Sequence, residues 1–238
     1  MKRFLTLILA LAACSTALAQ TDFRCVYNFA SDSPIVSAKL ESWSVDNWGD
    51  SYLSSGFGFR AVPLSLSSGY LDIARNFNFW HNVPILKDFS LQAEFNGRIN
   101  MDNSNFLAGL SYTVPLERNV LRASVLYKTF NGGASSAFPV QLTLLWRLYD
   151  IFGMEGLDFR GTARGWGEYT GYWYGESNPV EGDPGEFIIV ANPQLWYAVG
   201  HFFGACNLSV GGELELSYNW LGRRGFHARP SAGLKLQF

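Results

Sequence analysis

The chain ends in Ser231-Ala232-Gly233-Leu234-Lys235-Leu236-Gln237-Phe238, and this stretch decides how we interpret the rest of the sequence. Every even-numbered residue in it is apolar, and every odd-numbered residue is polar or glycine. Successive side chains of a β-strand point to opposite faces, so this pattern predicts a final strand with one apolar face and one polar face.

The same stretch has a polar residue at Ser231, glycine at Gly233, an apolar residue at Leu236 and an aromatic residue at Phe238. This order resembles the carboxy-terminal signal by which bacterial outer-membrane β-barrels are recognised and inserted. The resemblance implies that residues 231–238 bind the barrel-assembly machinery. A soluble protein can also end in an amphipathic strand, so the remaining sequence has to decide between the two.

The amino terminus predicts secretion. Lys2 and Arg3 precede an apolar stretch over residues 4–13, and Ala17-Leu18-Ala19 has the small residues of a cleavage site. We therefore expect residues 1–19 to be a signal peptide and residues 20–238 to form the mature protein. A competing interpretation is a lipoprotein signal over residues 11–14, with Cys14 acylated.

The composition excludes several classes of protein. Hydrophobic residues make up 48% of the chain and charged residues 16%, against about 25% charged in ordinary globular proteins. After residue 19 there is no apolar run of about 18 residues that would span a membrane as a helix. Only helices and closed barrels satisfy their backbone in hydrocarbon, so a barrel is the remaining membrane fold. The net charge of −2 offers no basic surface for nucleic acid.

Alternating apolar and polar residues recur along the mature chain. We therefore expect an all-β fold, a single antiparallel transmembrane β-barrel of about 12 strands with apolar side chains outward and polar ones inward. Pro193 interrupts the tenth strand and predicts a bulge or a strand end there. The expected strands lie at residues 23–29, 35–45, 52–60, 69–80, 89–98, 106–112, 121–128, 140–147, 157–166, 187–198, 208–219 and 226–238.

Connection lengths predict the orientation. Bacterial barrels have short periplasmic turns and longer outer loops, and the even-numbered connections here are short. This pattern places both termini in the periplasm. The longest connection, from Tyr169 to Glu186, then lies outside, where it either folds over the mouth or projects freely. The short connections lie at residues 46–50, 81–87, 115–119, 150–155 and 199–201.

The inward faces collect charged residues of both signs, because Arg or Lys facing lipid near the midplane would cost about 2 to 4 kcal/mol. Such a wall suits a neutral, hydrogen-bonding solute, and inward aromatic rings can stack on a base or a sugar. The alternative is that the charges pair with one another and plug the barrel. The candidate solute-binding residues are Tyr52, Arg60, Tyr70, Asp72, Glu94, Arg98, Arg122, Arg147, Arg160, Arg164, Trp166, Glu213 and Glu215.

Four short segments support a family resemblance, namely residues 46–49 (DNWG), 72–77 (DIARNF), 192–197 (NPQLWY) and 212–215 (GELE). They resemble segments of the nucleoside-specific channel (Tsx-like) outer-membrane proteins. The resemblance implies a monomeric 12-stranded barrel through which nucleosides diffuse passively. The family's nucleoside contacts are not assigned to particular residues here.

The function expected from the sequence is a channel in the bacterial outer membrane for small polar solutes, first of all nucleosides. Two alternatives are a non-conducting structural or adhesive barrel that acts through its outer loops, and a lipid-modifying hydrolase. Only His227, with Ser217 and Asn219 nearby on the last hairpin, suggests catalysis, so we expect no enzyme, and no spacing predicts a metal or cofactor. Cys25 and Cys206 are expected to be small apolar wall residues, although the compartment would permit a disulfide.

Overall fold

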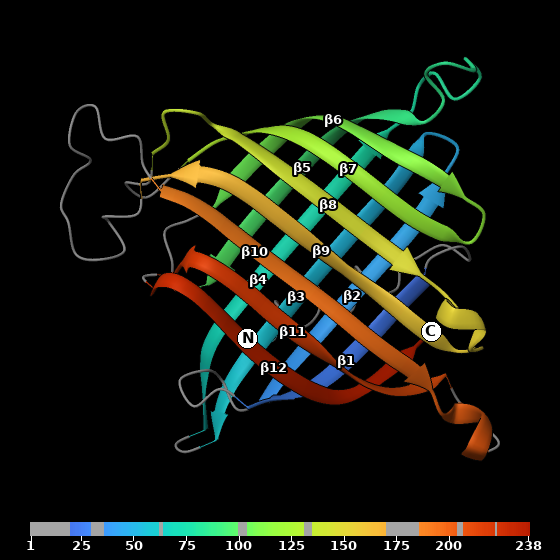
Figure 1. Cartoon of the computed structure of the whole chain (residues 1–238), viewed down its shortest axis with the longest axis vertical. Coiled ribbons are helices and arrows are strands. Elements are labelled where there is room, and N and C mark those ends of the chain that lie inside the picture. The colour runs from blue at the N-terminus through green and yellow to red at the C-terminus, as the bar shows by residue number, and fades with distance from the viewer. Residues whose placement is uncertain are drawn as a thin grey trace, which may run out of the picture.

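The computed structural model describes residues 20–29, 36–61, 64–99, 104–130, 135–169, 186–203, 207–221 and 223–238. Within them, 12 strands pair in sequence order into one closed antiparallel barrel, which confirms the predicted fold class (Figure 1). The strands are β1 (Gln20–Asn28), β2 (Val36–Asp46), β3 (Gly49–Ala61), β4 (Leu64–Phe77), β5 (Phe89–Ile99), β6 (Asn105–Leu116), β7 (Asn119–Lys128), β8 (Val140–Leu148), β9 (Leu157–Glu168), β10 (Glu186–Ala198), β11 (Leu208–Trp220) and β12 (Arg223–Gln237).

The barrel closes where the last strand pairs with the first. In this seam Asp22 lies opposite Gln237, and the Phe238 N–H donates to the Thr21 carbonyl at 2.8 Å. The seam also requires glycine at 233, since a Cβ there would lie 2.1 Å from the Cys25 carbonyl oxygen. The stretch that decided the sequence interpretation is therefore one side of the closing seam. We call the end of the barrel that holds Gln20 and Phe238 the terminal end, and the opposite end the loop end.

The predicted alternation is confirmed in the exposure of the side chains. On β7, Val125 is 55% exposed on the outer face, whereas Arg122 and Lys128 on the inner face are 5% and 4% exposed. The outer face is apolar and the inner face carries charges, which is the arrangement that a barrel wall in lipid requires. Cys25 lies on the outer face as an exposed residue, and a disulfide to Cys206 falls outside the described residues.

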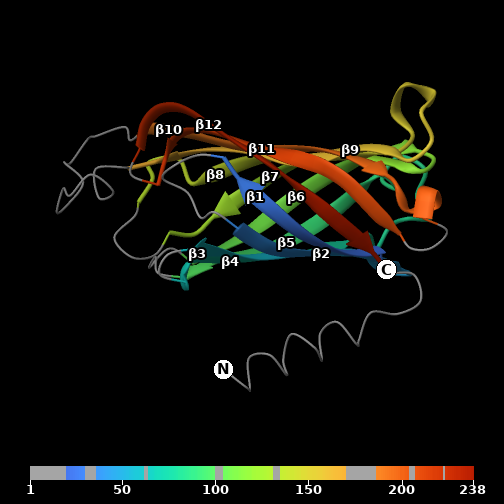
Figure 2. The same cartoon turned by 90° about the horizontal axis from the view of Figure 1, so that it is seen from below.

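The barrel is flattened. Figure 2 shows β9 to β12 in its upper part and β2 to β5 in its lower part. Two apolar clusters fill the space between, one around Trp43 and Tyr52 and one around Trp166, Ile188 and Trp220. Flattening brings inward side chains of opposite walls within reach of one another.

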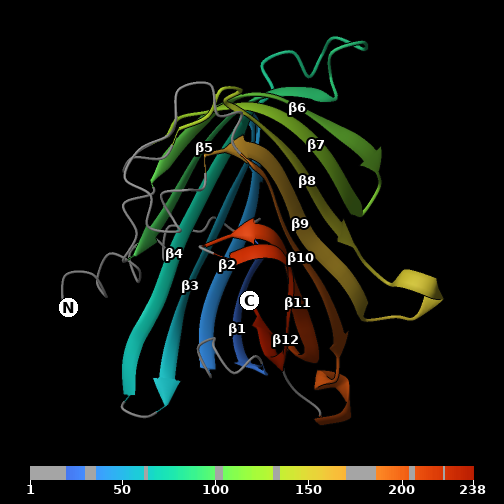
Figure 3. The ribbon, with the colours of Figure 1, turned by 60° about the vertical axis from the view of Figure 1, so that its left-hand side comes forward.

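Connections at the terminal end, which were predicted to be short, differ in length, and the one between β4 and β5 spans residues 78–88. The β2–β3 and β6–β7 turns have two residues each, residues 47–48 and 117–118. The β8–β9 connection contains the short helix η1 (Ile151–Gly153), and the β10–β11 connection contains η3 (Gly200–Phe203). Both stand away from the barrel wall (Figure 3). Residues 1–19, which include Cys14, and residues 170–185 of the ninth connection lie outside the described residues.

The prediction of a bulge or a strand end at Pro193 is wrong. β10 runs through Pro193, which pairs with Gly161 on β9 without a register shift. On the other side, pairing with β11 is interrupted at Asn192 and Pro193 and resumes in the same register at Gln194. The proline, which has no N–H to donate, lies where no ladder bond to β11 is made. A register shift instead occurs between β3 and β4, at Gly58 and Phe59.

Among the described residues, no helix has the length and apolar character needed to cross a membrane.

Candidate functional site

The centre of the lumen is occupied by charged side chains grouped around Arg24 of β1. The side chain of Arg24 is 1% exposed and lies 3.0 Å from Asp22, 2.6 Å from Glu41 and 2.8 Å from Glu213. The carboxylates come from β1, β2 and β11, and Lys39 of β2 also pairs with Glu213. A guanidinium presents several N–H donors in one plane, so it can hold several carboxylates at once.

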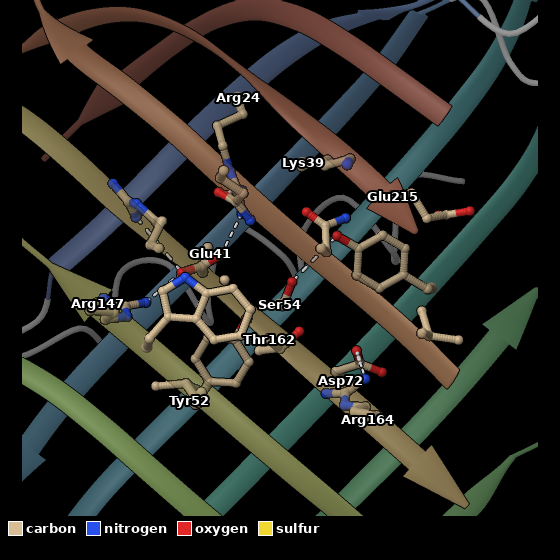
Figure 4. Close-up of a pocket in the computed structure, with 18 of the residues that line it drawn as sticks. Arg24, Lys39, Glu41, Tyr52, Ser54, Asp72, Arg147, Thr162, Arg164 and Glu215 are labelled. Carbon is tan, nitrogen blue, oxygen red and sulfur yellow. Dashed lines mark hydrogen bonds and ion pairs between the residues drawn. The ribbon is translucent and has the colours of Figure 1, made fainter. Parts of the chain in front are cut away.

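The same carboxylates bind cations from the opposite wall. Glu41 accepts a hydrogen bond from Arg147 of β8 at 2.5 Å, and Asp22 accepts one from Arg160 of β9 at 2.6 Å. Figure 4 shows Arg24, Glu41 and Arg147 around one central space. We call the set Asp22, Arg24, Glu41, Arg147 and Arg160 the central ion network. It links β1 and β2 to β8 and β9 across the lumen.

Two further arginines form ion pairs across the lumen. Arg122 of β7 binds both carboxylate oxygens of Asp50 on β3, at 2.9 and 2.6 Å. Arg164 of β9 lies 2.9 Å from Asp72 on β4 and 3.2 Å from Glu94 on β5. Inward charges therefore do pair with one another, as one of the alternatives left open by the sequence requires.

Aromatic rings support the same cations. The guanidinium groups of Arg122 and Arg147 each lie 4.9 Å from the ring centroid of Trp43. Lys128 Nζ lies 3.5 Å from the centroid of Trp166, and the guanidinium of Arg98 lies 4.9 Å from that of Trp220. These distances are typical of cation–π contacts, which hold a cation without neutralising its charge.

Between these side chains the lumen contains a series of cavities. A cavity of about 690 Å³ at the terminal end shares Arg122 with a smaller one of about 20 Å³. The cavity of about 20 Å³ shares Tyr52 and Arg164 with the central cavity of about 110 Å³. The central cavity in turn shares Arg98 and Arg164 with an outer cavity of about 40 Å³. Each cavity thus shares lining side chains with the next.

The structure brings together 12 of the 13 predicted site residues. Trp166 lines the outer cavity, Glu94 the smallest cavity, and Arg122 the smallest and the terminal cavities. Glu213 is buried between Arg24 and Lys39. The others line the central cavity, namely Tyr52, Tyr70, Asp72, Arg98, Arg147, Arg160, Arg164 and Glu215.

Arg60 is the exception, and its predicted place in the site stays a prediction. Within the described part of the chain, the residue is exposed and lines none of these four cavities. β3 ends one residue later, at Ala61, so the long side chain of Arg60 leaves the strand beside solvent at the loop end.

Sequence reasoning missed three carboxylates of the lumen and one cation. Lys39 and Glu41 alternate with Leu40 on β2, and this alternation would have assigned them to the lumen, but no faces were assigned to that strand. Asp50 was placed in a turn, whereas β3 already begins at Gly49. Asp22 precedes the predicted start of the first strand.

The residues considered for catalysis do not form a catalytic arrangement. Ser217 lies opposite His227, as expected across the last hairpin. However, the His227 ring is bonded to the Arg224 carbonyl at 3.0 Å, and the Asn219 side chain accepts a bond from the Gly225 N–H. The contact between nucleophile and base that a triad requires is therefore not made in this arrangement. No group of His, Cys, Asp and Glu in the described parts of the chain is arranged to hold a metal.

The closed 12-stranded barrel, with its apolar outer face and charged lumen, is similar in fold to a porin of known structure. The NanC porin matches with a TM-score of 0.51 and 8% identity, over 92% of this chain and 100% of that one. Pseudomonas aeruginosa OccK11 (OpdR) matches with a TM-score of 0.37 and 10% identity, over 94% of this chain and 68% of that one. A BenF-like porin from Pseudomonas fluorescens Pf-5 matches with a TM-score of 0.38 and 8% identity, over 94% and 65%. Of these three, the likeness to NanC supports the fold.

The chain belongs to the family described as Domain of unknown function (DUF5020), whose model matches residues 19–238. No curated protein is similar enough to count as a match. The family description names no solute, so the resemblance to nucleoside-specific channels stays a prediction.

Proposed function

We propose that this protein is a passive channel of the bacterial outer membrane for small polar solutes, with both termini in the periplasm. The observation that carries the proposal is the series of four cavities along the lumen, in which each cavity shares lining residues with the next. A polar solute that follows this series meets charged and hydroxyl groups rather than apolar wall. The similarity to porins agrees with this role.

The cavities limit the size of the solute. Drug-sized ligands occupy pockets of about 300 to 1,000 Å³, whereas the central cavity has about 110 Å³. Ions and very small solutes therefore fit the observed arrangement. Nucleosides, which we propose as the preferred solutes, require Tyr52 or Arg164 to move, because these side chains separate the central cavity from its smallest neighbour.

The chemistry of the lining favours nucleosides among solutes of that size. Tyr52, Tyr70 and Trp166 present rings on which a base can stack, and the neighbouring charges supply hydrogen bonds of both kinds. A solute without net charge avoids the strong attraction to one ion that would hold it in the lumen.

Liposome swelling with refolded protein of residues 20–238 tests the proposal. We expect faster swelling with nucleosides than with sugars and amino acids of similar size. Equal rates for all solutes of one size would contradict the nucleoside preference but not the channel. No swelling with any solute, from protein whose heat-modifiable gel migration shows that it is folded, would contradict the channel.

The central ion network favours a second candidate, a non-conducting barrel that acts through its outer loops. Arg24 and Glu41, with side chains 1% and 6% exposed, fill the middle of the lumen. Current recordings in planar bilayers separate the two functions. A folded barrel that passes no ionic current at any voltage would favour the structural role.

A further inference from the structure

The wall of the central cavity carries more cations than anions. Six cationic and three anionic side chains line it. Asp22 and Glu213 offset part of this charge, but neither of them lines the cavity, and both lie against Arg24. A solute in the cavity is therefore closer to guanidinium and ammonium groups than to several of the balancing carboxylates.

Arg98 of β5 differs from the other cations of this wall. Each of the other five lies within 4.0 Å of a carboxylate, as Arg164 does with Asp72. Within the described part of the chain, no carboxylate lies that close to Arg98. Its guanidinium instead lies over the ring of Trp220, and the side chain lines both the central and the outer cavity.

This position leaves the charge of Arg98 available to a solute. The ring of Trp220 covers one face of the guanidinium and attracts it without neutralising it. The N–H groups lie in the plane of the guanidinium, where they match the two oxygens of a carboxylate. A small carboxylate that moves between the two cavities passes beside these donors.

We propose that Arg98 is a specificity-determining residue of the channel and makes it prefer small carboxylate anions to cations of similar size. The inference rests on the proposed function, because only a conducting barrel has a selectivity. It adds a charge preference among solutes small enough for the observed cavities.

Reversal potentials in planar bilayers test this inference with refolded protein of residues 20–238 in gradients of potassium chloride and potassium acetate. We expect anions to be more permeant than potassium. Arg98→Gln should lower the ratio of anion to cation permeability roughly tenfold, because one charge about 6 Å from the path in water changes each ion's permeability about threefold and acts in opposite directions on the two ions. Arg98→Lys should keep the preference for anions but lower the permeability to acetate relative to chloride, because it loses the planar pair of donors.

Arg118→Gln is the matched control. It removes the same charge from a turn at the terminal end, where the side chain is 75% exposed and paired with Asp150, and should leave the ratio unchanged. A preference for potassium, or an equal ratio in wild type and Arg98→Gln, would overturn the role of Arg98 while the channel itself stands. A folded protein that passes no current in either salt would overturn both the channel and this inference.

Discussion

Replacing Glu41 by glutamine should destabilise the barrel more than the same change at a less buried carboxylate. Glu41 lies 2.6 Å from Arg24, 2.5 Å from Arg147 and 3.7 Å from Arg160, and its side chain is 6% exposed. Glutamine keeps the shape of the side chain but removes its charge. Three cations would then share a space from which one balancing carboxylate has been removed.

The size of the effect follows from burial. Removing one partner of a buried ion pair destabilises a protein by about 3 to 5 kcal/mol, because the other charge stays buried without compensation. An exposed pair contributes about 0 to 1 kcal/mol. Glu215 supplies the comparison, because it pairs with Arg229 at 3.0 Å and its side chain is 34% exposed. We therefore expect Glu41→Gln to lower the free energy of unfolding by about 3 to 5 kcal/mol, and Glu215→Gln by about 1 kcal/mol or less.

Reversible urea unfolding from lipid vesicles, followed by tryptophan fluorescence, measures both variants. The double variant Glu41→Gln/Arg147→Gln should recover part of the loss, because it also removes a cation that Glu41 no longer balances. Losses of equal size in Glu41→Gln and Glu215→Gln would refute the reasoning, since burial would then make no difference to the contribution of the charge.

Three further predictions concern the lumen, the seam and assembly. Arg164→Ala should speed liposome swelling with solutes that wild type passes slowly, because Arg164 lines three of the cavities; an unchanged rate would contradict its place in the path. Gly233→Ala should lower the free energy of unfolding by about 1 to 3 kcal/mol through its backbone clash, whereas Gly167→Ala, whose Cβ meets nothing closer than 3.7 Å, should change it by less than about 0.5 kcal/mol. Phe238→Ala should reduce the amount of protein inserted in cells but not spontaneous refolding into vesicles, because the Phe238 backbone N–H still bonds to Thr21; equal insertion in cells would contradict recognition of the last residue.

The strands were predictable because lipid and water impose opposite demands on alternate residues. The alternation of apolar and polar residues, which placed Arg122 inward and Val125 outward on β7, predicted the facing of most wall residues. The alternation did not locate the ends of the strands. Asp50 was assigned to a turn, since alternation gives the face of a residue but not the point where its strand begins or ends.

The partners of the inward charges were not predictable. Glu41 and Arg147 are 106 residues apart, and knowing that both side chains face the lumen would not show that they meet. Which walls approach each other depends on strand register, tilt and the flattening of the barrel, and these are properties of the closed sheet. A pairing of charges was an open alternative from composition, but its particular partners required the structure.

The central ion network connects stability to conductance. Glu41 both holds opposite walls together and occupies the space through which a solute would pass, so a single substitution acts on both properties. If the barrel is a channel, Glu41→Gln should conduct more than wild type while it unfolds more easily, because Arg24 and Arg147 then repel each other and move apart. If the network is instead a plug with no path on either side of it, the variant should lose stability and still pass no current. Unfolding and bilayer recordings on this one variant therefore separate the two functions that the filled lumen leaves in competition.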